Sequence, residues 1–311
     1  MIDWEDYVVG KYEAGLVSVI IPTYRRPKMI RRSIDSVLNQ TYQNIELLIV
    51  DDNVTGDEYS VSLRELLNEY TDRRLILVEQ EQHINGAAAR NAGIRKARGE
   101  YIAFLDDDDY WEFTKIERQL GILKELSDEW GGVSCKFQRV NKDGNVIGKS
   151  AKYRDGHIYL DILNLITDVT TCSLLLRHEC LDRVGFFDEA LKRHQDYQLL
   201  VNFTYKYKLK EVDEYLLNID VSDRQNSPDP EKAVEYKMAF FESVAPIMKT
   251  LNTRDYKCVI CMHNFELGYI CLKNREIKKG IRYMLSVCSS FKAIILVIRK
   301  CVEKFVFIVR R

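Results

Sequence analysis

The sequence predicts an α/β protein with a mixed, mostly parallel sheet flanked by helices and a helical appendage at the C-terminal end. Between residues 16 and 126, short apolar runs alternate with stretches in which apolar side chains recur at helical spacing. Several of the apolar runs end in polar or acidic residues, and beyond residue 230 only the helical spacing remains. Strands that alternate with helices are joined by right-handed crossovers, so their carboxyl ends meet at one edge of the sheet.

The first half of the chain supplies four strand patterns. The first apolar run stops at Pro22, and Pro27 suits the first turn of the helix that follows. The second run stops at Asp51 and Asp52, and the fourth stops at a series of aspartates. We expect these ends to meet at one sheet edge, where open α/β sheets bind ligands. The predicted strands are residues 16–21, 45–50, 75–78 and 101–105, and the predicted helices lie near 27–40, 63–67, 86–97 and 116–123.

The rhythm of the chain changes after about residue 126. Residues 132–137 and 170–176 have strand patterns, 141–145 a hairpin-turn pattern, and 196–207 a helical pattern. These segments are irregularly spaced, so their pairing cannot be predicted from the pattern.

Domain boundaries follow from the same changes of pattern. Two prolines and several polar residues between 221 and 230 indicate a linker. We therefore expect one domain over residues 1–225, with halves of about 16–126 and 127–225, and a helical region over 226–311.

The acidic run after the fourth strand, Asp106 to Asp109, is the main candidate site. Four adjacent carboxylates repel one another and raise each other's pKa values, and a divalent cation relieves that repulsion. Hard oxygen ligands suit Mg²⁺ or Mn²⁺, which commonly bind one or two carboxylates together with substrate phosphates. The alternative is an acidic loop that caps the next helix, and the run alone does not decide between them. No glycine-rich phosphate loop follows the first strand, so metal would meet the charge of a diphosphate.

Composition narrows the class of partner. The chain has 46 basic and 47 acidic residues and a net charge of −1, which argues against nucleic acid as the main partner. Its eight cysteines follow no scaffold pattern, so free thiols in a reducing cytoplasm are expected. The first six residues lack the apolar segment of a secretory signal, and no run of eighteen uncharged apolar residues is present.

The C-terminal region predicts helices, including a hairpin over about 264–285 with Gly280 inside its second helix. The tail, residues 291–311, combines an apolar face with six basic residues against a single acid, Glu303. A basic amphipathic helix of this kind can lie on an anionic membrane surface. The alternative is a terminal helix packed on its own domain. We favour peripheral contact with the inner face of the cell membrane.

With these motifs in place, the chain resembles glycosyltransferase family 2, the inverting nucleotide-sugar transferases with the GT-A fold. The resemblance covers about residues 16–120, with weaker matches at 185–189 and 195–197 that extend it to about 205. Any one motif is weak evidence, but five in order at the family's spacing are specific. They are residues 17–24 (VSVIIPTY), 36–42 (SVLNQTY), 46–53 (ELLIVDDN), 89–94 (ARNAGI) and 99–111 (GEYIAFLDDDDYW).

The resemblance implies a donor half, about 16–126, that holds the metal and diphosphate. Asp106 and Asp108 match the family's D-x-D motif, so Asp108 is expected to bind the metal and Asp106 to contact the ribose or sugar. Asp107, between them, is placed with the donor-binding residues. Arg90 lies at a matching helix start and is expected near the donor sugar or phosphates, although a helix-surface charge is an equal alternative.

The resemblance also implies a nucleobase pocket and a catalytic base. Asp52 is expected to hydrogen-bond the base, uracil by analogy, while Pro22 and Tyr24 line the base and ribose pocket. Asp196, in the acceptor half of about 127–225, matches the aspartate that removes the acceptor's proton. Without the resemblance, Asp196 would be an ordinary acid in a first helical turn, and Tyr24 could simply pack at the sheet edge.

Three departures from the family pattern qualify these assignments. Gln195 and Asn202 replace a Glu before the base and an Arg after it, which puts the electrostatic support of Asp196 in doubt. Phe113 replaces a proline after the acidic run and is expected to reshape the acceptor edge. Arg25 and Arg26 stand where Asn-Arg is common, and we interpret that change as neutral.

Together these observations predict a cytoplasmic, metal-dependent inverting glycosyltransferase of bacterial surface-polysaccharide type. The expected donor is a UDP-sugar, and the expected acceptor is a saccharide or lipid-linked saccharide. One alternative is a sugar nucleotidyltransferase, which would need the missing glycine-rich loop. The other is a non-catalytic protein that binds sugar nucleotides. The sequence does not identify the donor sugar, the acceptor, the linkage or the oligomeric state.

Overall fold

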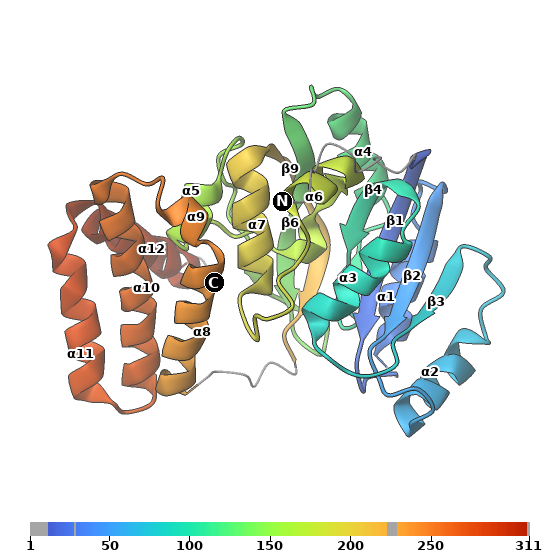
Figure 1. Ribbon diagram of the computed structural model, residues 1–311, viewed down its shortest axis with the longest axis horizontal. Helices are drawn as coiled ribbons and strands as arrows, with labels where there is room; N and C mark the ends of the chain where they lie inside the picture. The colour runs from blue at the N-terminus through green and yellow to red at the C-terminus, as the bar shows by residue number, and fades with distance from the viewer. Residues whose placement is uncertain (1–11, 28, 223–228, 310–311) are drawn as a thin grey trace, which may run out of the picture. The chain divides into compact units, whose positions relative to one another are not determined.

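The four strands of the predicted donor half pair side by side, in the order β3-β2-β1-β4, and all run parallel (Figure 1). The structure is a computed structural model that describes residues 12–27, 29–222 and 229–309. The first six residues and the last two, Arg310 and Arg311, therefore lie outside the described part. The strands are β1 (Glu13–Thr23), β2 (Ile45–Asp51), β3 (Leu75–Glu79) and β4 (Gly99–Phe104), connected by the helices α1 (Ile30–Leu38), α2 (Glu58–Leu67) and α3 (Gly86–Lys96).

Strand β1 is buried on both faces, as expected for a central parallel strand covered by helices. The close approach of α3 to this strand depends on Gly93. A Cβ atom at Gly93 would lie 2.5 Å from Cγ2 of Ile20, so only glycine allows the helix to pack at this distance. The helix also contacts β2, which fixes its N-terminal end near the carboxyl ends of the strands.

Strand register places the polar strand ends at one level. Thr23 pairs with Asp51 across β1 and β2, and Ile20 pairs with Phe104 across β1 and β4. The Leu105 N–H continues this ladder by donating to the Ile20 carbonyl over 3.1 Å. The aspartates that follow Leu105 therefore emerge beside the end of β1.

The sheet continues with antiparallel and parallel pairs, in the order β4-β8-β6-β9-β5, with β7 paired to β6. Strand β8 is antiparallel to both β4 and β6, while β9 is parallel to β6. The sheet is therefore mixed, as predicted; the first four strands are all parallel, and β6 and β9 form a further parallel pair. The further elements are β5 (Tyr110–Trp111), α4 (Lys115–Lys124), β6 (Trp130–Val140), β7 (Val146–Lys149), β8 (Leu175–Arg177), α6 (His178–Val184) and β9 (Lys208–Asp220).

Two sequence expectations for this half need correction. The strand predicted over 170–176 begins later, because a 3-10 turn, η2 (Thr171–Ser173), precedes β8. The Ser173 hydroxyl donates to the Thr170 carbonyl over 2.6 Å, which favours the turn over extended backbone. Strand β9 was not predicted at all, although the hairpin turn at 141–145 joins β6 to β7 as expected.

The described residues form two compact units. The first comprises those within Met1–Gly156, Val169–Phe187 and Lys206–Asp223, and the second those within His157–Asp168, Asp188–Tyr205 and Arg224–Arg311. The sequence places a single boundary near residue 225. In the structure, two segments that precede this boundary group with the C-terminal helices.

The second unit is helical. Helices α8, α10 and α11 lie side by side (Figure 1), and α10 contacts both of the others. The predicted hairpin with Gly280 inside its second helix is present as α10 and α11. A Cβ atom at Gly268 would lie 3.0 Å from the Gly280 carbonyl oxygen, so the two backbones touch. The elements of the second unit are α5 (Tyr159–Leu163), α7 (Gln195–Lys206), α8 (Pro230–Ser243), α9 (Ala245–Met248), α10 (Thr253–Lys273), α11 (Ile277–Ser286), η3 (Val287–Ser289) and α12 (Phe291–Val309).

Within the described residues, no single helix has the length and apolar composition needed to cross a membrane. Two consecutive segments, Ile277–Ser289 and Phe291–Lys300, together have that length and apolar composition, but their axes bend by 118° at the break between them.

Candidate active site

The acidic run lies at the carboxyl end of β4, against the end of β1. The Thr23 hydroxyl donates to Asp107 over 2.8 Å, and Asp107 is buried. Burial raises the pKa of Asp107 to about 7, and the Thr23 hydrogen bond only partly opposes this shift. At neutral pH this carboxyl group therefore holds its proton more strongly than an exposed aspartate does.

Arginines of the first unit surround the run. The Arg26 guanidinium donates to Asp108 over 2.8 Å and lies 3.6 Å from Asp107. Arg32 of α1 donates to the Asp108 carbonyl over 2.7 Å and to the Asp220 carboxylate over 2.9 Å. Burial raises the pKa of Asp108, the neighbouring Asp106 adds to the shift, and Arg26 opposes it. The arginines therefore do not fully offset the burial and mutual repulsion that disfavour the ionised aspartates.

Arg90 extends from α3 to Asp106. Its guanidinium donates to the Asp106 carboxylate, and also to the Gly86 carbonyl over 3.2 Å. The guanidinium carbon lies 5.6 Å from the centre of the Phe187 ring, which supports its planar group. The helix begins at Asn85, whose side chain accepts from the N–H groups of its first turn. Arg90 is thus held beside the acidic run, and its contact with the donor stays a prediction.

Asp52 and Tyr24 lie together at the ends of β2 and β1. Asp52 is buried, and its carboxylate accepts from Gln80 over 2.9 Å and lies 2.8 Å from Nδ1 of His83. Burial raises the pKa of Asp52, and His83 opposes the shift. The His83 ring stacks on Tyr24 with a centroid distance of 3.7 Å and an interplanar angle of 14°. Pro22 is half-buried at the end of β1.

The carboxylate oxygens of Asp106 and Asp108 fit a hard divalent cation. Asp106 and Asp108 raise the energy of each other's ionised form, and bound Mg²⁺ or Mn²⁺ would remove that penalty. A second possible grouping has ligand atoms of Asp106, Asp109 and Cys172 within 4.8 Å of one another. Burial raises the pKa of the Cys172 thiol well above its usual value, so the thiol stays protonated and is a poor ligand.

Asp196 belongs to the second compact unit, in the first turn of α7. The chain before it is fixed by hydrogen bonds. The Gln198 N–H donates to the His194 carbonyl over 2.9 Å, and the Gln198 side chain accepts from the Asp188 N–H over 3.0 Å. Gln195, which replaces the family's Glu, donates to the Leu191 carbonyl instead of presenting a charge.

His194 adopts the left-handed conformation, with φ of 65°, directly before this helix. Its ring lies 5.7 Å from the Phe240 ring of α8 and 5.8 Å from the Tyr197 ring, measured between centroids. Burial lowers the pKa of His194 to about 4, and the nearby Lys237 adds to that shift. His194 is therefore neutral at physiological pH.

A buried ionic network lies beneath this segment. Lys237 of α8 is only 3% exposed; it donates to the Glu266 carboxylate over 2.7 Å and to Nδ1 of His263 over 3.1 Å. His263 in turn donates from Nε2 to the Leu163 carbonyl over 2.9 Å. Burial lowers the pKa of His263 well below its usual value, so the ring is neutral. Its Nδ1 accepts from Lys237 and its Nε2 donates to Leu163, so both nitrogens are hydrogen-bonded. These bonds connect α8, α10 and the end of α5.

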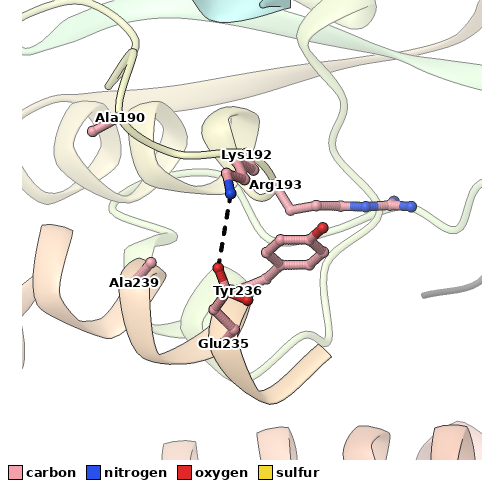
Figure 2. A pocket seen from close by; sticks show the side chains of 6 residues that line it. All are labelled: Ala190, Lys192, Arg193, Glu235, Tyr236 and Ala239. Carbon is pink, nitrogen blue, oxygen red and sulfur yellow. Dashed lines mark ion pairs between the residues drawn. The ribbon is translucent and has the colours of Figure 1, made fainter. Parts of the chain in front are cut away.

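The loop before α7 also packs on the outside of α8. Figure 2 shows Lys192 and Glu235 approaching each other across this junction, with an ion pair of 3.9 Å. They line a cavity of about 60 Å³ together with Ala190, Arg193, Tyr236 and Ala239. The loop that precedes Asp196 is thus attached to the C-terminal helices.

The structure brings seven of the eight candidate residues into the first unit, at or near the carboxyl ends of its strands. Asp196 is in the second unit. No roles were assigned to Thr23 and His83 from the sequence. Arg26 was given no role either, because the departure from the family pattern at Arg25 and Arg26 was interpreted as without effect. Each of these residues lies at the carboxyl end of a strand or in the loop that follows one, and this position is the signal that could have identified them.

The chain matches a family model described as glycosyl transferase family 2 over residues 18–185, which is more than half of its length. Glycosyltransferase RP339 of Rickettsia prowazekii, itself uncharacterized, is 30% identical over 194 residues, covering 60% of this chain and 58% of that protein. AmsB of Erwinia amylovora, an amylovoran biosynthesis glycosyltransferase, is 27% identical over 246 residues, covering 77% and 81%.

WfaP of Escherichia coli is named as a UDP-Glc:alpha-D-GlcNAc-diphosphoundecaprenol beta-1,3-glucosyltransferase. It is 40% identical over 109 residues, which are 35% of this chain and 41% of WfaP. The chain thus spans less than two thirds of the length of both RP339 and WfaP.

Solved structures share the fold. Residues 1–349 of TarS from S. aureus, in complex with UDP-GlcNAc, align with a TM-score of 0.59 at 15% identity, over 88% of this chain and 91% of that one. The mannosyltransferase PcManGT of Pyrobaculum calidifontis, in complex with GDP-Man and Mn²⁺, aligns with a TM-score of 0.58 at 17% identity, over 93% and 80%. These alignments confirm the predicted fold class.

Proposed function

Because this chain belongs to glycosyl transferase family 2, we propose that it is a metal-dependent, inverting transferase that takes its sugar from a UDP-sugar. The proposed acceptor is a saccharide or lipid-linked saccharide of a bacterial surface polysaccharide. The observation that carries the proposal is the acidic run at the end of β4, whose carboxyl groups are crowded enough to favour a divalent cation.

Asp106 and Asp108 are the residues proposed to hold the metal. When bound, Mg²⁺ or Mn²⁺ stabilises the negative charge that develops on the leaving diphosphate. Arg26 and Arg90 pair with Asp108 and Asp106 in this structure. With those carboxylates bound to a metal, the two guanidinium groups would bind phosphate oxygens instead.

The nucleobase is proposed to bind at Tyr24 and Asp52. Tyr24 already carries an aromatic ring, that of His83, on its face. A uracil ring can take that position, and its N–H can donate to the buried Asp52 carboxylate. Asp107 and Pro22 complete the donor side, Asp107 through its bond to Thr23 at the end of β1.

Asp196 is proposed as the base that takes the proton from the acceptor hydroxyl while that oxygen attacks the anomeric carbon. A single displacement from the face opposite the leaving group inverts the anomeric configuration. The names of AmsB and WfaP, which refer to amylovoran and to a diphosphoundecaprenol acceptor, support a polysaccharide role and a lipid-linked acceptor.

The proposal is tested by calorimetric binding of UDP, GDP and CDP, each with and without Mn²⁺. We expect UDP to bind only with metal, and we expect Asp108→Ala to abolish that binding. Asp143→Asn, in the exposed turn between β6 and β7, is the matched control and should bind as the wild type does. Cys172→Ser should also leave binding unchanged, since the thiol is not a proposed ligand. Preference for GDP or CDP would overturn the UDP assignment, and metal-independent binding would overturn the metal site.

A further inference from the structure

An unbroken apolar line runs along the outside of α11. Ile277, Ile281 and Leu285 follow one another at intervals of four residues, so they share one helix face. They are 59%, 50% and 63% exposed. An adjacent side of the helix packs on α10 through Gly280, where an added Cβ atom would lie 2.8 Å from the Leu272 side chain. The apolar line is therefore turned away from α10 and has no cover within the described residues.

Helix α12 repeats this arrangement. Phe291, Ile295, Ile298 and Val302 recur at helical spacing and are 75%, 49%, 57% and 54% exposed. The other side of the helix is packed, because Ala293 is fully buried against the side chains of α10. Both helices thus use one face to hold α10 and leave a second apolar face outside.

The charge of this segment has one sign. From Ile277 to Val302 the sequence contains six basic residues and no acidic residue. Lys279 pairs with Glu276 over 2.9 Å, and Lys292 pairs with Asp255 over 2.6 Å. The other four are shared between the two helices. They are Lys278, Arg282, Arg299 and Lys300.

We propose that the seven exposed apolar residues of α11 and α12 form a docking surface for an anionic lipid bilayer. This membrane-docking surface combines apolar side chains that can enter the acyl boundary with cations that match acidic headgroups. A second copy of the chain is a poorer occupant, because a two-fold contact would bring two sets of like charges together. The inference goes beyond the proposed function and does not depend on the sugar transferred.

The geometry indicates binding along the surface. The axes of α11 and α12 bend by 118° at a short break, so the two helices do not form one straight segment. Each helix also keeps one side packed on α10. Packing on α10 therefore keeps one side of each helix out of the bilayer.

Vesicle flotation tests the proposal with the full chain. The vesicles are phosphatidylcholine, with or without phosphatidylglycerol. We expect binding to the anionic vesicles only, and we expect added salt to weaken it. The paired substitutions Ile281→Ser with Leu285→Ser, and Ile295→Ser with Ile298→Ser, should each lower the partition coefficient roughly tenfold or more. The control is Met238→Ser on α8, which is 60% exposed in the same unit and should bind as the wild type does.

Cys288 provides a local probe, because it is exposed in η3, between the two helices. An environment-sensitive fluorophore on Cys288, in a Cys301→Ser background, should shift its emission to the blue when anionic vesicles are added. Equal binding to neutral vesicles would refute the charge complementarity, and absence of binding would refute the surface itself. A dimer in lipid-free solution that the serine pairs dissociate would also overturn the proposal, since it would assign the surface to a second copy.

Discussion

Asp107→Asn is expected to make the metal-free protein more stable, and more so at pH 8 than at pH 5.5. The carboxyl group has a pKa of about 7 in the folded state, against 3.8 when unperturbed, because it is buried. The unfolded chain therefore releases this proton at lower pH than the folded chain does. Stability is lost as the pH rises from about 4 and is lost fully above the folded pKa. Asparagine removes the ionisation and keeps an oxygen that can accept from Thr23.

The magnitude follows from the pKa shift. Each pKa unit corresponds to about 1.4 kcal/mol, so the ionised carboxylate costs the folded state about 4 kcal/mol above pH 8. Between pH 5.5 and pH 8 the stabilising effect of Asp107→Asn should grow by about 2 kcal/mol. The change with pH is the sharper quantity, because it does not depend on how well the amide packs.

Urea unfolding in EDTA, followed by tryptophan fluorescence, measures this difference. Trp111 and Trp130 both lie in the unit that contains Asp107, so they report on its unfolding. Asp143→Asn, on an exposed turn, is the control and should show no pH-dependent gain. A difference between variant and wild type that stays constant from pH 5.5 to pH 8 would refute the reasoning. So would a variant that is less stable at pH 8.

Three further predictions concern the base, the ionic network and the sheet. Asp196→Asn should lower turnover of the UDP-sugar by about a hundredfold or more, with UDP binding unchanged; near-normal turnover would exclude the base role. Lys237→Met should lower the free energy of unfolding by about 2 kcal/mol, because Glu266 loses its partner. Adding Glu266→Gln should restore most of this loss. Equal urea-unfolding free energies for the wild type and the two variants would contradict the prediction. Gly93→Ala should destabilise by about 2 kcal/mol by forcing α3 away from β1, whereas Gly121→Ala, with nothing within 4 Å of the added carbon, should not.

The parallel half of the sheet could be predicted because its strands are buried on both faces. Such strands appear as continuous apolar runs, and the residues after each run mark the sheet edge. That logic placed the acidic run beside the end of β1, where the Thr23 hydroxyl binds Asp107.

Strand β9 could not be predicted, because charged residues interrupt its pattern. Lys208 pairs with Glu129, and Lys210 pairs with Asp155 over 3.0 Å, so partners far away in the sequence neutralise charges that a local pattern counts against a strand. The role of Arg26 was missed for a similar reason. Its contact with Asp108 exists only once β1 and β4 are adjacent.

The grouping of Asp196 with the C-terminal helices also lay beyond the sequence pattern. It depends on contacts such as that between the rings of His194 and Phe240, which no periodicity reveals.

If Tyr24 and Asp52 bind the nucleobase as proposed, the stack of His83 on Tyr24 affects the release of the product. His83 covers the Tyr24 ring, and its Nδ1 lies 2.8 Å from the Asp52 carboxylate. A nucleobase at the proposed site would displace contacts of the same kind as those it makes, so its net contribution to binding would be small. His83 would take back the position on the Tyr24 ring when the nucleotide leaves. Such an exchange would speed the release of a nucleoside diphosphate after each turnover, because the contacts that His83 makes would replace those that the departing base loses.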